Sequence, residues 1–181
     1  VTRLGDRDLL YLNSGGRFDE SSERLGIDRT GSNVGCWFFD YNNDARLDIF
    51  TVAGGMGQAS SVFLDYVGVS SDGVRPQLYT NSGTVFLNSS SVAGLNRVLP
   101  AMGGNFGDLD NDGWPDVYLG LGEPAMTGQY PNRAFWNDGG RRFYDVTTIA
   151  GLGHLQTGSS VAFGDIDNDG DQDIVEVMGG L

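Results

Sequence analysis

Residues from which many catalytic sites and disulfide frameworks are built are scarce in this sequence. Cys36 is the single cysteine and His154 the single histidine among 181 residues. An intrachain disulfide is therefore impossible. A serine triad or a zinc site would need histidine or cysteine partners at recognisable spacing, and the sequence offers none.

Basic residues and long apolar stretches are scarce as well. The chain has 11 Lys and Arg against 24 Asp and Glu, which gives a formal net charge of −13. Nucleic acid is not an expected partner, because phosphate contacts need clustered basic residues. No apolar run approaches the ~18 residues that a membrane span needs, and no signal segment opens at Val1. We therefore expect no membrane span, and a chain that is a mature product or a fragment.

The acidic residues are concentrated rather than spread. Half of them fall in three short clusters, whereas 10 Phe, 7 Tyr and 3 Trp are distributed along the whole chain and predict a folded core. The clusters comprise Asp40, Asp44 and Asp48; Asp108, Asp110, Asp112 and Asp116; and Asp165, Asp167, Asp169, Asp171 and Asp173.

An internal repeat accounts for the spacing of these clusters. Phe18, Phe86 and Phe143 open matching ten-residue segments, and each is followed 22 residues later by the first Asp of a cluster. The repeats are 68 and 57 residues apart, and an insertion around 56–73 explains the difference. Repetition at such a period indicates a repeat fold.

Each repeat is predicted to consist of about four short antiparallel strands. Asn-Ser-Gly and Asn-Asp-Gly turns join short segments rich in Ile, Val, Leu, Tyr and Phe, which is typical of β-hairpins. The expected fold is all-β, with β-propeller-type blades and three repeat units in offset register. The single repeat domain 1–181 divides into the second half of a unit (1–27), a unit with a degenerate acidic loop and the insertion (28–95), a complete unit (96–152) and the first half of a unit (153–181).

The acidic loops have the pattern of a calcium site. Residues 108–116 and 165–173 carry carboxylates at positions 1, 3, 5 and 9, a glycine at position 6 for a sharp turn, and a position-7 carbonyl that can add an oxygen. Oxygen ligands without His or Cys favour Ca²⁺. An EF-hand has a bidentate Glu at position 12, which is Leu119 in one loop and Glu176 in the other. An EF-hand is rejected, because one loop lacks this Glu, position 9 is Asp in both, and both loops have β-type flanks.

The first loop is degenerate, with Asn42 at position 3 and Ala45 at position 6, so we expect two strong Ca²⁺ sites and one weaker site. The predicted metal residues are Asp108, Asp110, Asp112, Trp114 and Asp116; Asp165, Asp167, Asp169, Asp171 and Asp173; and Asp40, Asn42, Asp44, Arg46 and Asp48.

These motifs resemble the FG-GAP/VCBS repeat family. The pattern Phe-Gly-Asp-x-Asp-x-Asp-Gly-x-x-Asp begins at Phe106 and Phe163, with Phe39-Asp40 in the degenerate copy, and the segment 143–152 is similar to repeats of ASPIC/UnbV-associated proteins. The resemblance implies a β-propeller of the integrin α-subunit type with calcium in a hairpin loop of each blade. It also implies an extracellular or cell-surface protein for adhesion, recognition or scaffolding; a minority of related propellers are polysaccharide lyases.

Propellers have 4–8 blades, whereas this sequence has three repeats in offset register, so the sequence does not decide how a complete propeller is formed. The chain can be a piece of a larger propeller, it can assemble with other copies through complementary half-units, or it can close as a three-bladed ring.

The expected function is non-enzymatic, with other copies of the chain or the remainder of a larger propeller as partners and a protein or a glycan as a further ligand. The alternatives are a calcium-dependent polysaccharide-active enzyme, for which Arg133, Arg141 and Arg142 are candidates, and a lectin-like glycan binder. Trp37, Trp114 and Trp136 are the candidate sugar-stacking residues of such a binder, although core packing is the commoner role of such aromatics.

Overall fold

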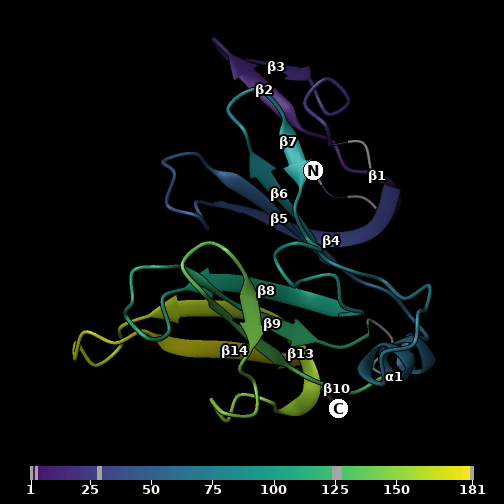
Figure 1. Ribbon diagram of the computed structural model, residues 1–181, viewed down its shortest axis with the longest axis vertical. Helices are drawn as coiled ribbons and strands as arrows, with labels where there is room; N and C mark the ends of the chain where they lie inside the picture. Colours follow the sequence, from purple (N-terminus) through teal and green to yellow (C-terminus); the bar gives the residue numbers. More distant parts are fainter. Residues whose placement is uncertain (1, 3, 28–29, 124–127, 180–181) are drawn as a thin grey trace.

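The computed structural model describes residues 2, 4–27, 30–123 and 128–179, which form short strands and one short helix (Figure 1). The first unit and the segment before it contain β1 (Leu4–Arg7), β2 (Tyr11–Ser14), β3 (Arg17–Glu20), β4 (Thr30–Phe39), β5 (Asp48–Ala53), α1 (Ala59–Tyr66), β6 (Gln77–Asn81) and β7 (Phe86–Asn88). The remainder contains β8 (Ala101–Gly107), β9 (Asp116–Leu121), β10 (Tyr130–Pro131), β11 (Arg133–Asn137), β12 (Phe143–Asp145), β13 (Leu155–Gly164) and β14 (Asp173–Gly179). The predicted all-β, propeller-like fold is confirmed.

The strands form sheets that follow the repeat. The most regular sheet has the order β12-β11-β9-β8, and a second has the order β1-β4-β5-β6-β7. A three-stranded sheet, β10-β13-β14, and the separate hairpin β2-β3 complete the arrangement. Every pairing is antiparallel, so each blade is a meander of neighbouring strands.

The acidic loops all join the first two long strands of a blade. Phe39 pairs with Asp48, Gly107 with Asp116 and Gly164 with Asp173 at the ends of the three strand pairs. The loops therefore lie at one edge of consecutive blades, as the repeat predicts.

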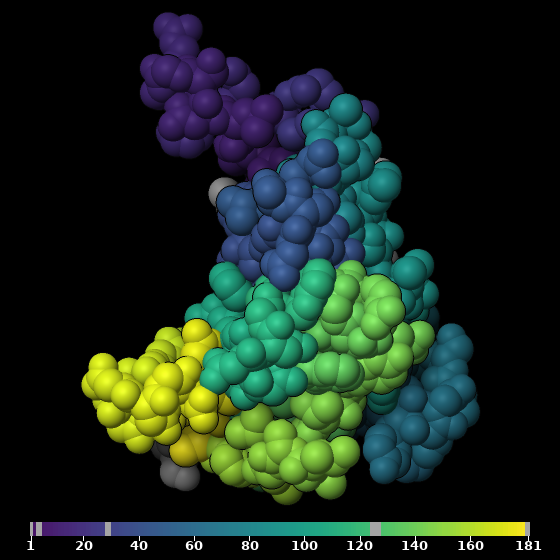
Figure 2. Space-filling view, turned by 60° about the vertical axis from the view of Figure 1, so that its left-hand side comes forward, coloured from purple at the N-terminus to yellow at the C-terminus, as the bar shows by residue number. Residues whose placement is uncertain are grey.

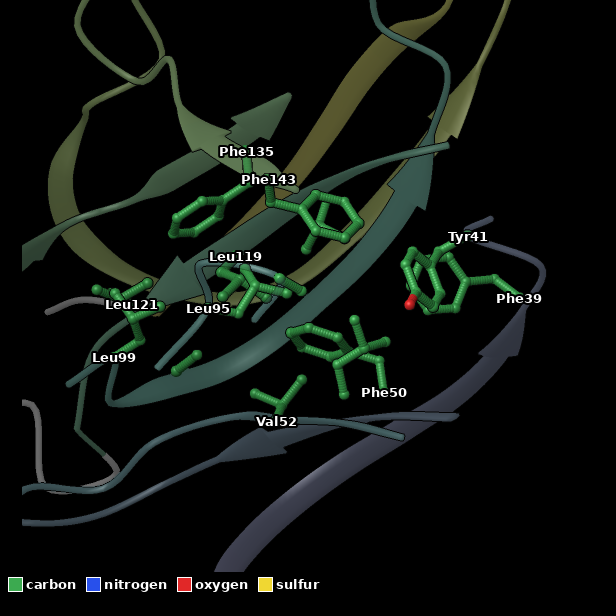
Figure 3. Close-up of a cluster of buried hydrophobic side chains, with 14 of the residues drawn as sticks. Phe39, Tyr41, Phe50, Val52, Leu95, Leu99, Leu119, Leu121, Phe135 and Phe143 are labelled. Atoms are coloured by element: carbon green, nitrogen blue, oxygen red, sulfur yellow. The ribbon is translucent and has the colours of Figure 1, made fainter. Parts of the chain in front are cut away.

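The main core lies between the first two blades. Phe50 and Val52 from β5 face Leu119 and Leu121 from β9, as Figure 3 shows. Trp37 stacks on Phe50 with ring centroids 4.8 Å apart. Burial of each such side chain contributes about 1.5–3 kcal/mol, so blade-on-blade packing is the main source of stability.

The sequence analysis did not predict the helix α1. It lies in the insertion and none of its residues is buried. Val62 of the helix packs against the main core, and Asp65 accepts a 2.7 Å hydrogen bond from the guanidinium of Arg97, which precedes β8. Among the described residues, no helix has the length and apolar content that a membrane crossing requires.

Truncation of a buried side chain at this interface tests the core. Leu119→Ala is expected to lower the free energy of unfolding by about 2–5 kcal/mol, because the side chain is fully buried between two blades and its loss leaves a cavity. Urea unfolding at matched calcium concentration measures the change. Leu87→Ala, at an exposed position in β7, serves as the control and should stay within about 0.5 kcal/mol.

Candidate metal centre

The first Asp of each loop supports the turn of its own backbone. The Asp108 carboxylate accepts hydrogen bonds from the amides of Asp112 (3.1 Å) and Gly113 (2.8 Å). Asp165 accepts the same two bonds from Asp169 (3.1 Å) and Gly170 (3.0 Å). The repeat in sequence is therefore a repeat in loop geometry.

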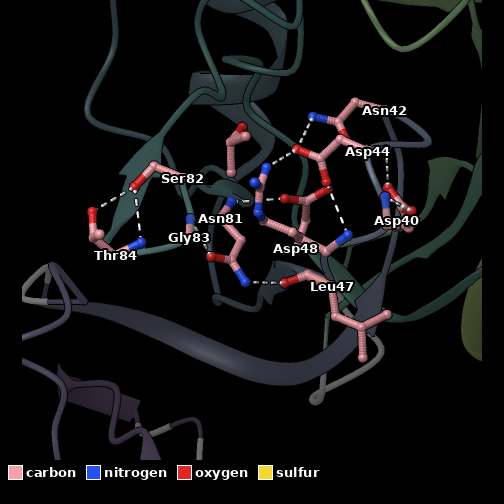
Figure 4. A network of polar contacts seen from close by, with 12 residues as sticks. Asp40, Asn42, Asp44, Leu47, Asp48, Asn81, Ser82, Gly83 and Thr84 are labelled. Atoms are coloured by element: carbon pink, nitrogen blue, oxygen red, sulfur yellow. Dashed lines mark hydrogen bonds and ion pairs between the residues drawn. The ribbon is translucent and has the colours of Figure 1, made fainter.

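The degenerate loop has the same hydrogen bonds. Asp40 accepts bonds from the amides of Asp44 (3.0 Å) and Ala45 (2.8 Å), as Figure 4 shows for the Asp40 carboxylate. At position 5, Asp44 accepts a 2.9 Å bond from the amide of Arg46, as Asp112 does from Trp114 and Asp169 from Asp171. The position-7 residues thus donate an amide to a loop carboxylate.

Each loop needs left-handed backbone at positions 4 and 6. The φ angles are 58° at Asn111 and 88° at Gly113, and 62° at Asn168 and 98° at Gly170. Asparagine and glycine tolerate this region well. Ala45 adopts a φ of 64° in the degenerate loop, where its Cβ makes the same turn strained.

Two groups of three carboxylates converge closely enough to share a cation. Ligand oxygens of Asp108, Asp110 and Asp112 all lie within 4.8 Å of one another, and so do those of Asp165, Asp167 and Asp173. A cluster of hard oxygen donors fits Ca²⁺ better than a soft metal. Within the described part of the chain, no third group of three carboxylates meets this distance.

Position 9 has a second role that the sequence analysis missed. Asp116 is fully buried, and its two oxygens accept bonds from the amides of Leu109 (2.9 Å) and Asn137 (2.7 Å). Asp48 bonds in the same way to Tyr41 (3.3 Å) and Asn81 (2.7 Å). This carboxylate joins the start of its loop to the outer hairpin of the blade, and we call it the position-9 clamp.

Burial has an electrostatic cost at the clamp. It raises the pKa of Asp116 to about 6, and the pKa of Asp48 likewise to about 6, despite the backbone amides that favour the charged form. The nearby loop carboxylates add to the rise, since they repel a further negative charge. A cation bound in the loop would offset both effects.

The degenerate loop differs in its charges. An Arg46 guanidinium nitrogen lies 3.3 Å from an Asp44 carboxylate oxygen, and Asn42 replaces the carboxylate found at position 3 of the other loops. Arg46 therefore supplies to Asp44 part of the positive charge that a cation would supply. This difference in charge is consistent with the weaker first site expected from the sequence, which stays a prediction.

Consecutive loops are bonded to each other through position 4. The Asn43 side-chain amide donates to the Gly113 carbonyl at 3.0 Å, and Asn111 donates to the Gly170 carbonyl at 3.3 Å. The Asn111 side-chain amide also donates to the Asp171 carboxylate at 2.6 Å. Asp171, a predicted metal residue, therefore contacts the neighbouring loop. The sequence signal for these contacts between loops was the asparagine at position 4 of all three loops.

The residues considered for the alternative functions make local contacts. Arg133 lies 3.4 Å from Asp145 and Arg141 lies 2.8 Å from Asp138, while the Arg142 guanidinium lies over the Tyr144 ring. Among the tryptophans, Trp37 packs against the main core, Trp136 lies 6.1 Å from Tyr144 and Trp114 approaches Gly140.

The strained turn of the degenerate loop can be relieved by one substitution. Ala45→Gly removes the Cβ at a left-handed position and is expected to raise the free energy of unfolding by about 0.5–1 kcal/mol in chelator. Gly113→Ala, at the equivalent position, should lower it by a similar amount, because nothing lies near its added Cβ and only backbone strain changes. Urea unfolding measures both; the same sign for the two variants would contradict the strain argument.

Comparison with known families agrees with this geometry. Residues 123–176 match the family model described as an FG-GAP-like repeat. The matched segment includes β11, β12, β13 and the acidic loop that begins at Asp165. No curated protein matches the chain. The segment 123–176 is therefore an FG-GAP-like repeat, in a chain whose other acidic loops have the same geometry.

Proposed function

We propose that this chain is a non-enzymatic, calcium-binding extracellular repeat protein that acts in adhesion, recognition or structural assembly. The observation that carries the proposal is the recurrence of converging carboxylates in the same backbone geometry on successive blades. Asp108, Asp110 and Asp112 would hold one ion, and Asp165, Asp167 and Asp173 another. Each ion would neutralise part of the loop charge and stiffen the turn between two strands.

The chemistry of the donors supports calcium. Three carboxylates with oxygens this close repel each other unless a cation or protons neutralise them. The carbonyl oxygens of a turning loop can complete the larger coordination shell of Ca²⁺, whereas Mg²⁺ demands stricter octahedral geometry. With a formal net charge of −13, bound cations would also reduce repulsion across the whole molecule.

An extracellular role in adhesion, recognition or assembly is the part of the proposal that follows from the FG-GAP-like repeat, since such repeats are typically extracellular. A polysaccharide-active enzyme has less support, because the three candidate arginines each contact a neighbour in their own blade.

Calcium titration by calorimetry tests the proposal directly. We expect two tight sites and one weaker site, with Asp110→Ala and Asp167→Ala each removing one tight site. Both side chains are exposed, so the substitutions should not disturb the core. Asp72→Ala, an exposed acid outside the loops, is the matched control and should bind as the wild type does.

Thermal unfolding provides a second readout. Calcium at 100 times the dissociation constant should stabilise the fold by about 2.7 kcal/mol for each occupied site, and excess chelator should remove this gain. Absence of both binding heat and a shift in Tm would overturn the calcium proposal.

A further inference from the structure

The hairpin β2-β3 has the position of an outer hairpin without inner strands. The Leu25 carbonyl, just after it, accepts a 2.8 Å bond from the Phe86 amide at the start of β7. Ala93, one repeat later, accepts the equivalent 2.9 Å bond from Phe143 at the start of β12. Within the described residues, β2 and β3 pair with each other alone, and both strands are exposed along their length.

The pair β13-β14 is the reverse case: in the part of the chain that the structure describes, these inner strands have no outer hairpin beside them. Val175 and Val177 on β14 are 49% and 55% exposed. Their equivalents in the first blade, Phe50 and Val52, are buried between blades. One face of β14 therefore has the residues of a blade interface, and its outer edge has no partner among the strands that the structure describes.

An apolar hollow of about 460 Å³ lies between the N-terminal hairpin and the first blade. Leu10, Tyr11 and Phe18 line it on one side, and Phe38 and Ile49 line it on the other. We call it the N-terminal hollow.

The repeat shows which element the N-terminal hollow fits. Phe106, the residue equivalent to Phe38 in the next blade, packs against the preceding blade, with its ring centroid 5.2 Å from that of Phe39. Phe163 packs in the same way against the cluster around Tyr118. Phe38, by contrast, is 51% exposed. The N-terminal hollow therefore lies where the inner strands of a preceding blade would pack against Phe38.

We infer that β14 of one copy pairs with β2 of a second copy, so that two half-blades form one complete blade. The repeat specifies the register: Ile174 lies opposite Tyr11 and Val175 opposite Leu10, as Ile49 lies opposite Tyr79 and Phe50 opposite Leu78. Val175 and Val177 then enter the N-terminal hollow. The inference rests on the assembly role proposed above and names its partner.

The position-9 clamp supports the same register. Asp48 and Asp116 each bond to the asparagine that ends the adjacent strand, Asn81 or Asn137, at 2.7 Å. Asp173 accepts a bond from Ile166 but, within the described residues, has no such asparagine amide. Asn13 of β2 is the equivalent residue, and its amide would complete the clamp in the second copy.

The loop contacts continue across the same boundary. Asn43 and Asn111 each donate to the position-6 carbonyl of the following loop. Asn168 is the third asparagine of this series, and the carbonyl of Ala45 in the second copy is the corresponding acceptor.

Two copies would form a ring of six blades, within the range of 4–8 that propellers adopt. In each copy the described residues form two full blades and two half-blades, and each half-blade would belong to a shared blade. In Figure 2 the N-terminal hairpin and the C-terminal strands project from the same side of the molecule, which suits closure by a single partner. Head-to-tail contacts of this kind close when the rotation allows and otherwise extend.

The oligomeric state and its two surfaces can be tested separately. Light scattering should give the wild type about twice the 19.4 kDa of one chain. Val175→Glu and Phe38→Glu place a charge on the two sides of the proposed interface, and each should weaken association by about tenfold or more. Val69→Glu, at a similarly exposed valine outside the interface, should leave it unchanged.

Mixing distinguishes this interface from others. A Val175→Glu copy keeps an intact hollow and a Phe38→Glu copy keeps an intact β14, so the mixture should regain association through one interface. In a Cys36→Ser background, the pair Leu10→Cys and Val175→Cys should crosslink copies on oxidation, whereas Asp19→Cys with Val175→Cys should not.

A wild-type chain that is monomeric at every concentration, or a dimer that both charged variants leave intact, would overturn the inference. Calcium titration of the same samples separates the two proposals: calcium binding by a monomer would overturn the pairing alone, and a dimer that binds no calcium would overturn the calcium site alone. A circular dichroism spectrum that matches that of the wild type, measured for each variant, excludes misfolding as the cause of lost association.

Discussion

The structure depends on a buried carboxylate that bonds to two backbone amides from separate segments. At Asp48 and Asp116, one oxygen secures the start of the acidic loop and the other secures the outer hairpin of the blade. Removal of one partner from such a buried group leaves a charge without compensation, which costs more than an ordinary hydrogen bond. The loop, the inner strands and the outer hairpin of a blade are therefore stabilised together.

Close packing of backbones joins the second blade to the third. A Cβ added to Gly103 would lie 2.4 Å from the carbonyl oxygen of Ser159 and would collide with it. A Cβ added to Gly120 would lie 3.0 Å from the main chain of Gly158, a tighter contact than side chains usually make. Some of the 29 glycines are therefore needed because two sheets approach each other and not because the chain turns.

Much of this organisation could be predicted from the sequence, because local chemistry repeats with it. The Asn-Ser-Gly and Asn-Asp-Gly turns, the strands after each acidic loop and the nearly all-β fold follow from patterns within ten residues. The helix α1 could not be predicted, since its residues have no buried stripe or side-chain cap and Arg97, which bonds to its Asp65, is distant in sequence. The dual contacts of Asp116 were missed for a similar reason: Asn137, its partner, is contributed by another strand.

If the loops hold the proposed ions, the bonds between position 4 of one loop and position 6 of the next would couple the binding of one ion to that of another. Asn111 stands between two candidate ligands of its own loop, and its amide bonds to the Gly170 carbonyl and the Asp171 carboxylate of the neighbouring loop. An ion that orders one loop would also order its neighbour, so the second ion would meet a turn that is already fixed. Occupancy along the row of loops would then be cooperative, with a coupling free energy carried by single asparagine side chains.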